Sequence, residues 1–224
     1  ILLSSEVASI DKSENKFSIS YLQNGTTNKI DCDAVLSTIP SYTASGLFTK
    51  YDKEFKTHAD AIYYPPVLVY YLVFDRKNIK QELDGFGFLI PAKENKSFLG
   101  ALWSSVIFSD RTDETKAAFT LFIGGSRNPE FVKEERSALL IKVRKEFEML
   151  MGITTDPVFS SERNKEKAIP QYNLGYVEHE RFFDEFEKRN PGLFISGNFR
   201  GGISVGDCVK NADLVADKIC NNVK

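Results

Sequence analysis

The sequence predicts a fold of the α+β or α/β class, in which a mixed, mainly antiparallel sheet packs on helices beside part of a layered α/β domain. Four runs of aromatic and β-branched residues follow one another between residues 67 and 125, separated by charged or glycine-containing turns. A helical repeat over residues 129–151 comes next. Near the start, the short strand at 34–36 is apolar at every position, which is typical of the interior of a layered sheet.

The first sixty residues predict strands and a hairpin around that interior strand. Val7 lies in one β-like run, and apolar residues alternate over 17–21 before Asn24-Gly25, a strong signal for a tight hairpin. Residues 41–60 predict a connector with weak helical character.

The middle of the chain predicts a meandering sheet followed by a long helix. Leucine, valine and phenylalanine recur at helical spacing up to Gly152, which ends the helix. Residues 157–172 read as extended, and 182–189 as a short helix. The predicted strands of the sheet are 67–75, 85–91, 97–105 and 116–125.

The order of these elements predicts two domains, because the chain starts in the layered domain, leaves it and returns. We expect residues 1–44 and 189–224 to belong to the layered domain and residues 45–188 to form the sheet-and-helix domain. The end segments are too short to form a domain alone, and the chain begins without Met. Both features suggest a piece of a longer protein.

Composition excludes several classes of function. The formal charge of −2 gives no electrostatic reason to expect a nucleic-acid partner. No apolar run reaches the roughly 18–20 residues that cross a bilayer. Three scattered cysteines favour a reducing compartment. His58 and His179 are isolated in the sequence, with no metal-ligand spacing, so we expect no metal site and no catalytic dyad.

The glycine-rich segment Gly197–Val205 carries the clearest functional signal. Glycines allow a backbone to come into contact with a ligand, and the helix predicted over 207–220 would direct its positive end at an anion. The alternatives are a loop that only needs tight turns, and an Asp207 that merely caps the helix.

Four stretches together resemble the protoporphyrinogen oxidase family of the FAD-dependent amine-oxidase-like superfamily. They occur in the family's order: "DGFGFLIP", "LGALWSSVIFSDR", "KAIPQYNLGY" and "PGLFISGNFRGGISVGDCV". The resemblance covers essentially the whole chain but only the C-terminal half of the family. The Gly-x-Gly-x-x-Gly unit for the ADP part of FAD and the membrane-associating helices belong to the other half, so this chain alone is expected to bind FAD weakly or not at all and to be inactive.

The resemblance implies a set of cofactor-binding residues. Gly197 and Asn198 are expected near the FAD pyrophosphate, and the adenine edge is expected at Val7, unless that residue is an ordinary strand valine. Thr38 stands at a strand end that approaches FAD, unless it is a plain strand terminus. The residues expected beside the flavin ring are Ile203, Ser204 and Val205.

The resemblance also implies an apolar clamp for a porphyrinogen, formed by Leu89, Leu102 and Phe122 with the adjoining Phe86. All four lie on predicted strands, so ordinary core packing is the alternative. Arg200 is a candidate for contact with the substrate rim. Trp103 is expected to be packing, and Pro170, Gln171 and Tyr172 to shape the backbone. Lys165 stands where family members often carry an aromatic residue, and no role is assigned to it.

The implied reaction is the six-electron oxidation of protoporphyrinogen IX to protoporphyrin IX in haem biosynthesis, with O2 as acceptor and no catalytic side chain, because the flavin carries the chemistry. Coproporphyrinogen III is the alternative substrate. A phytoene-desaturase-type or monoamine-oxidase-type enzyme and a flavin-free binding module are alternative functions. The resemblance implies a cytoplasmic protein, peripheral on the membrane through regions absent here, and an exposed sheet edge allows a homodimer.

Overall fold

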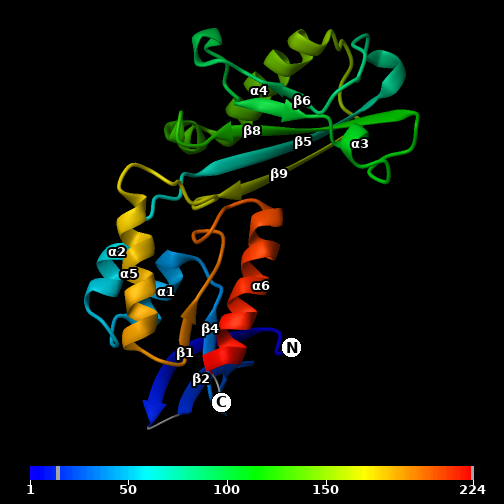
Figure 1. Ribbon diagram of the computed structural model, residues 1–224. Helices are drawn as coiled ribbons and strands as arrows, with labels where there is room; N and C mark the ends of the chain where they lie inside the picture. Colours follow the sequence, from blue (N-terminus) through cyan, green and yellow to red (C-terminus); the bar gives the residue numbers. More distant parts are fainter. Residues whose placement is uncertain (14–15, 223–224) are drawn as a thin grey trace. The chain divides into compact units, whose positions relative to one another are not determined.

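The computed structural model describes residues 1–13 and 16–222, and the chain forms two compact units (Figure 1). The first unit combines Ile1–Tyr63 with Ile169–Lys224, and the second is Tyr64–Ala168. The chain therefore leaves the first unit after Tyr63 and returns to it at Ile169. The limits at 63/64 and 168/169 differ from the predicted boundaries at 44/45 and 188/189.

Two small sheets lie in the first unit. Strands β1 (Ser5–Ser13), β2 (Lys16–Gln23) and β3 (Thr26–Cys32) form an antiparallel meander. Asn24 and Gly25 connect β2 to β3, both with positive φ, as the hairpin signal predicts. Strand β4 (Val35–Ser37) pairs in parallel with β10 (Leu193–Ile195).

The helices of the first unit explain its limits. An aromatic cluster joins α1 (Ser41–Phe48), α2 (Glu54–Ala61) and α5 (Tyr176–Arg189). At its centre, the Phe55 ring lies 5.3 Å from Phe48 and 4.8 Å from Phe186, measured between centroids. Because these rings are fully buried, the three helices belong to one core, whereas the predicted boundary at 44/45 divides α1 and the predicted second domain includes Phe48, Phe55 and Phe186.

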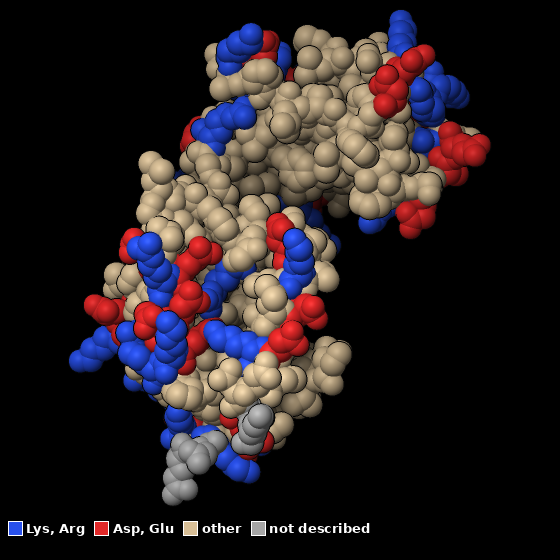
Figure 2. Space-filling model, viewed as in Figure 1, with Lys and Arg blue, Asp and Glu red and all other residues tan. Residues whose placement is uncertain are grey.

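The helix α6 (Val205–Asn222) completes the first unit, and in Figure 1 strand β10 runs between α5 and α6. Acidic and basic side chains intermingle over this part of the surface, whereas on the visible face of the second unit they gather at the two ends and leave an uncharged stretch between them (Figure 2).

The second unit is built on a five-stranded antiparallel sheet of order β6-β7-β8-β5-β9. It confirms the predicted mainly antiparallel sheet. Only two of the predicted strands keep nearly their full length, β5 and β8. The strand bounds are β5 (Val67–Asp75), β6 (Gly87–Leu89), β7 (Gly100–Leu102), β8 (Lys116–Gly124) and β9 (Phe159–Lys165).

Short helices interrupt the predicted elements of this unit. Three-residue turns η1 (Arg76–Asn78) and η2 (Ala92–Glu94) follow β5 and β6, and α3 (Ser104–Ile107) replaces the end of the strand predicted at 97–105. The predicted helix over 129–151 divides into η3 (Pro129–Lys133) and α4 (Arg136–Met151). Glu135 causes the break, because its carboxylate caps α4 by accepting from the N–H groups of Ser137 and Ala138.

One face of the sheet packs against α4 and makes the core of the second unit. Phe74 of β5, Phe119 of β8 and Phe147 of α4 are completely buried in it. Trp103 also lies in this core, so the prediction that it packs is correct. Among the described residues, no helix combines the length and the apolar character needed to cross a membrane.

Candidate cofactor and substrate sites

The carboxyl ends of β4 and β10 form the first candidate site. The two strands are parallel and in register, and the Ser196 N–H donates to the Ser37 carbonyl at 2.8 Å just beyond the last pair. Thr38 and Gly197 therefore leave the sheet side by side. Ligands of open α/β sheets bind outside such carboxyl ends.

A pocket of about 670 Å³ opens beside this edge. Val7, Leu36, Ser37 and Thr38 are among its lining residues. Leu36 was expected to be buried as part of an interior strand, but it is 43% exposed because it faces this pocket. The buried Ser37 hydroxyl has no hydrogen-bond partner in the part of the chain that the structure describes. A ligand that offers apolar surface to Leu36 would fit in this pocket.

The glycine segment that follows β10 depends on backbone geometry that side chains would disturb. Gly202 has a φ of +120°, and a Cβ at this position would lie 2.6 Å from the Cβ of Asp207. Gly197 has a φ of +138° and lies against the Phe199 ring. Glycine is thus required at these positions because a side chain would clash with neighbouring groups. A backbone without side chains also allows a flat or phosphorylated group to approach closely.

The residues predicted beside a flavin ring lie where the glycine segment becomes α6. The Ser204 hydroxyl accepts from the Asp207 N–H at 3.0 Å and donates to the Asp207 carboxylate at 2.6 Å. Ser204 is therefore the capping side chain, with Asp207 as its partner, and α6 begins at Val205, two residues before the predicted start. Ile203 and Val205 are exposed on either side of the cap.

Two tyrosines hold the glycine segment in place. The Tyr172 hydroxyl donates to the Asn198 carbonyl at 3.2 Å and accepts from the Gly202 N–H at 3.0 Å, so it bridges the two ends of the segment. Tyr176 stacks on Tyr172 at 4.2 Å, and its hydroxyl donates to the Phe199 carbonyl. These two hydrogen bonds show how Tyr172 shapes the backbone, whereas no sequence pattern indicated a role for Tyr176.

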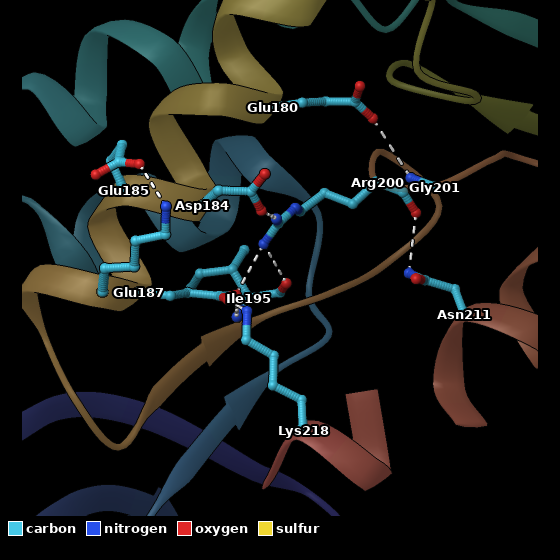
Figure 3. Close-up of polar contacts among 10 residues, drawn as sticks. Glu180, Asp184, Glu185, Glu187, Ile195, Arg200, Gly201, Asn211 and Lys218 are labelled. Atoms are coloured by element: carbon cyan, nitrogen blue, oxygen red, sulfur yellow. Dashed lines mark hydrogen bonds and ion pairs between the residues drawn. The ribbon is translucent and has the colours of Figure 1, made fainter. Parts of the chain in front are cut away.

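Arg200 belongs to an internal ion-pair network, not to a substrate rim (Figure 3). Its guanidinium donates to the Glu187 carboxylate at 2.8 Å and to the Ile195 carbonyl at 2.7 Å, and it also contacts Asp184. Glu187 additionally pairs with Lys218 of α6 and accepts from the Ile195 N–H at 2.7 Å. With the side chains of Arg200 and Glu187 only 12% and 6% exposed, this network fixes β10, α5 and α6 together.

The two histidines that are isolated in the sequence meet in the structure. The Nδ1 atoms of His58 and His179 lie 3.0 Å apart, and His58 stacks on the Phe182 ring at 4.1 Å. Burial lowers the pKa of His179, and the nearby charge of His58 lowers it further. This pair joins α2 to α5. No group of three potential metal ligands occurs among the residues that the structure describes.

The second candidate site is the face of the five-stranded sheet opposite α4, which we call the open face. Cross-strand pairing sets its first row as Leu89, Gly100, Phe122, Val69 and Arg163. The next row is Gly87, Leu102, Thr120, Tyr71 and Ser161. Directly paired residues point to the same side of a sheet, so Leu89, Leu102 and Phe122 share this face.

The three predicted clamp residues are not core residues. Leu89 is 85% exposed and Leu102 is 40% exposed. Gly100 lies between Leu89 and Phe122 in the ladder, and the Leu89 side chain packs close to its bare backbone, since a Cβ at Gly100 would lie 3.1 Å from Leu89 Cδ2. Phe86 precedes β6, and its side chain is exposed. Its backbone carbonyl accepts a hydrogen bond from the Trp103 N–H at 2.8 Å. The alternative of ordinary core packing therefore does not apply to Leu89 and Phe86.

The predicted site residues thus separate into two groups. Val7 and Thr38 line one pocket, and Gly197 meets the Thr38 carbonyl at its edge. Asn198, Ile203, Ser204 and Val205 continue from there to the start of α6. The clamp residues lie in the second unit. Sequence reasoning missed Val69, Tyr71 and Arg163 of the open face, although the alternation over 67–75 could have indicated the first two.

Comparison with known proteins identifies the family. The model of the "Flavin containing amine oxidoreductase" family matches residues 1–220. The chain belongs to this family. Flavin is the cofactor that the family's description names. The bare glycine backbone after β10 and the position of the pocket beside the carboxyl end of β4 both fit such a group.

Among curated proteins, the chain is similar to porphyrinogen oxidases. It is 38% identical over 159 residues to the mitochondrial protoporphyrinogen oxidase of Nicotiana tabacum, an alignment that covers 70% of this chain and 32% of that protein. It is 30% identical over 230 residues to the chloroplastic protoporphyrinogen oxidase of Oryza sativa subsp. japonica, covering 98% and 43%. A coproporphyrinogen III oxidase of Staphylococcus aureus is 24% identical over 149 residues, covering 66% and 32%. The chain therefore spans less than half the length of each of these relatives.

Solved structures support the same fold. A protein from Exiguobacterium sp. 255-15, assigned as a protoporphyrinogen oxidase, superposes with a TM-score of 0.77 at 19% identity, covering 96% of this chain and 46% of that chain. A putrescine oxidase variant gives 0.72 at 12% identity, covering 97% and 48%. At these identities the likeness concerns the fold alone.

Proposed function

We propose that the protein containing this chain is an FAD-dependent, oxygen-using oxidase that converts protoporphyrinogen IX to protoporphyrin IX in haem biosynthesis. The observation that carries the proposal is the open face, where Leu89, Leu102 and Phe122 lie in adjacent rows of the sheet. A porphyrinogen is a large, puckered and mainly apolar macrocycle, so an exposed apolar surface of this kind suits it. The naming of the plant relatives supports the same substrate.

We assign part of the FAD site to the first unit. Val7 and Thr38 line its pocket, Gly197 lies beside the Thr38 carbonyl, and Asn198 follows Gly197 in the chain. The segment from Ile203 to Val205 would approach the ring with the positive end of α6 behind it. Bound FAD would supply the redox chemistry, with O2 as the final acceptor, and the overall reaction would convert one protoporphyrinogen and three O2 to one protoporphyrin and three H2O2.

The side chains of this chain have positioning roles in the proposal. The apolar residues of the open face would hold the macrocycle and exclude water from it. Tyr172 and Tyr176 would keep the glycine segment in its ligand-accepting conformation through their bonds to Asn198, Gly202 and Phe199. We assign no catalytic acid or base.

The direct experiment uses the protein as its gene encodes it. It should purify with bound FAD, and mixing it with protoporphyrinogen IX in air should yield protoporphyrin fluorescence with about three H2O2 per porphyrin. A protein that binds FAD but leaves the substrate unchanged refutes the proposal. The 224-residue chain alone should bind FAD weakly and remain inactive.

Coproporphyrinogen III is the second candidate substrate, because the Staphylococcus aureus relative is named for it. The two substrates differ in the number of carboxylate side chains, so parallel assays with both decide between them. The expected cytoplasmic location, peripheral membrane contact and homodimer stay predictions, which cell fractionation and light scattering would check.

A further inference from the structure

The basic residues of β9 lie on the same face as the apolar clamp. Arg163 pairs directly with Val69, and Val69 pairs with Phe122. Lys165 pairs with Val67 in the same way. Because paired residues share a face, both cations belong to the open face. The contact between the rings of Tyr71 and Phe159, 6.3 Å apart, independently shows that β9 side chains pack with those of β5 on this side.

These two cations are available to an external anion. Every residue of β9 is exposed, and neither Arg163 nor Lys165 forms an ion pair with any residue that the structure describes. Glu162 and Asn164 alternate to the other face of the strand, since they pair with Tyr70 and Leu68 of the core. The ladder rows that contain the clamp include no acidic residue on the open face. One edge of an apolar surface is therefore positively charged.

The spacing of the strands suits a ligand that is apolar at its centre and charged at its margin. Neighbouring strands lie about 4.8 Å apart, so the backbone at Arg163 is about 10 Å from that at Phe122 and about 19 Å from that at Leu89. A macrocycle resting on Leu102 and Phe122 would therefore bring the carboxylates at its edge within reach of the two long side chains.

We propose that Arg163 and Lys165 bind the carboxylate groups of the porphyrinogen at the β9 edge of the open face. This inference rests on the proposed function and adds to it the residues that orient the macrocycle. The guanidinium of Arg163 can hold one carboxylate through two parallel hydrogen bonds, and the ammonium of Lys165 adds a second positive charge beside it. The apolar clamp then contributes affinity, and the cation pair selects which edge of the ring faces β9.

The test compares a charged ligand with its uncharged ester. Protoporphyrin IX and protoporphyrin IX dimethyl ester are titrated into the flavin-loaded protein as its gene encodes it, and binding is followed by porphyrin absorbance. The Arg163→Gln/Lys165→Gln variant should bind the diacid about 10-fold or more weakly, as expected for losing charge-assisted hydrogen bonds, while its affinity for the ester changes less than about 2-fold. Arg163→Lys should retain part of the preference for the diacid.

Lys145→Gln supplies the matched control. Lys145 is an exposed cation on α4, which packs on the other face of the sheet, so its removal changes net charge without touching the open face. It should leave both affinities unchanged.

Two results would overturn the inference. The double variant could bind the diacid as tightly as the wild type, or it could lose affinity for diacid and ester alike, which would indicate a structural effect. Turnover of protoporphyrinogen IX by the wild type is measured in parallel. If the wild type turns over normally and the variant keeps its ligand preference, only the cation assignment fails. If the wild type oxidises no porphyrinogen, the proposed function fails.

Discussion

The glycine segment of the first unit and the open face of the second use polar side chains in opposite ways. Around the glycine segment, Glu187, Arg200 and Tyr172 are engaged in holding the backbone, and the bare backbone is left for a ligand. On the open face the backbone is occupied by the sheet ladder, and the side chains, including Arg163, are left free. A charged side chain near a candidate site can therefore be structural, as Arg200 is. For the cations of the edge strand β9 we propose a role in ligand binding instead.

Substitutions on the two faces of the sheet of the second unit should show the largest difference between a structural face and a ligand-binding face. Phe147→Ala removes a fully buried ring beneath the sheet and should lower the free energy of unfolding by about 3–5 kcal/mol. Leu89→Ala on the open face should change it by less than about 0.5 kcal/mol. Trp103 fluorescence in urea reports this unit, because it contains the single tryptophan. A large destabilisation by Leu89→Ala would show that the open face is core.

The ion-pair network of the first unit should give the next largest effect. Glu187→Gln removes the charge shared by Arg200 and Lys218, and we expect a loss of about 1.5–3 kcal/mol, as is usual for hydrogen bonds to charged groups. Far-UV circular dichroism in urea measures it, and Trp103 fluorescence should report an unchanged second unit. Glu185→Gln is the control, because its pair with Lys188 is exposed to solvent and its removal should leave the stability essentially unchanged.

A smaller effect is expected from the tyrosine bridge. Tyr172→Phe removes one hydroxyl that serves both Asn198 and Gly202, so it should cost about 0.5–1.5 kcal/mol. In the flavin-loaded protein it should also weaken FAD binding, which fluorescence titration measures. Equal FAD affinity in wild type and variant would mean that the bridge does not shape the ligand site.

The smallest effect concerns pH. Because burial and then the charge of His58 lower the pKa of His179, the folded state favours the neutral ring. Its stability is fully present above the ordinary histidine pKa of about 6.5 and falls as the pH drops below that value, since the unfolded chain then binds the proton first. Urea titrations between pH 7.5 and 5.5 should show this decrease, and His179→Asn should reduce it. A pH slope that is the same in the variant would assign it to other groups.

Much of the fold could be predicted because the relevant patterns are local. The Asn24-Gly25 hairpin, the antiparallel meander and the glycine segment each follow from short stretches of sequence. The break before α4 was missed because Glu135 continues the helical composition while its side chain caps the next turn. The domain limits were missed because Phe48 and Phe55 meet Phe186 only after folding.

The site residues likewise divide into those that a local sequence motif indicates and those that come together only in the folded chain. Resemblance to known oxidases supplied Thr38, Gly197 and the clamp, but no local pattern brings His58 to His179 or Glu187 to Lys218. Arg163 was overlooked because the register of β9 against β5 decides on which face of the sheet Arg163 lies. The register between strands that are distant in sequence cannot be predicted from either strand alone.

The most direct test of the account measures porphyrin affinity and stability in one pair of variants. Leu102→Ala/Phe122→Ala in the whole flavin-loaded protein should lower the affinity for protoporphyrin IX by about 10-fold or more, because two apolar contacts worth roughly a kcal/mol each are lost. Val209→Ala, at an exposed apolar position on α6, should leave that affinity unchanged. Unaltered porphyrin affinity in a folded Leu102→Ala/Phe122→Ala protein would contradict the assignment of the open face as the substrate platform.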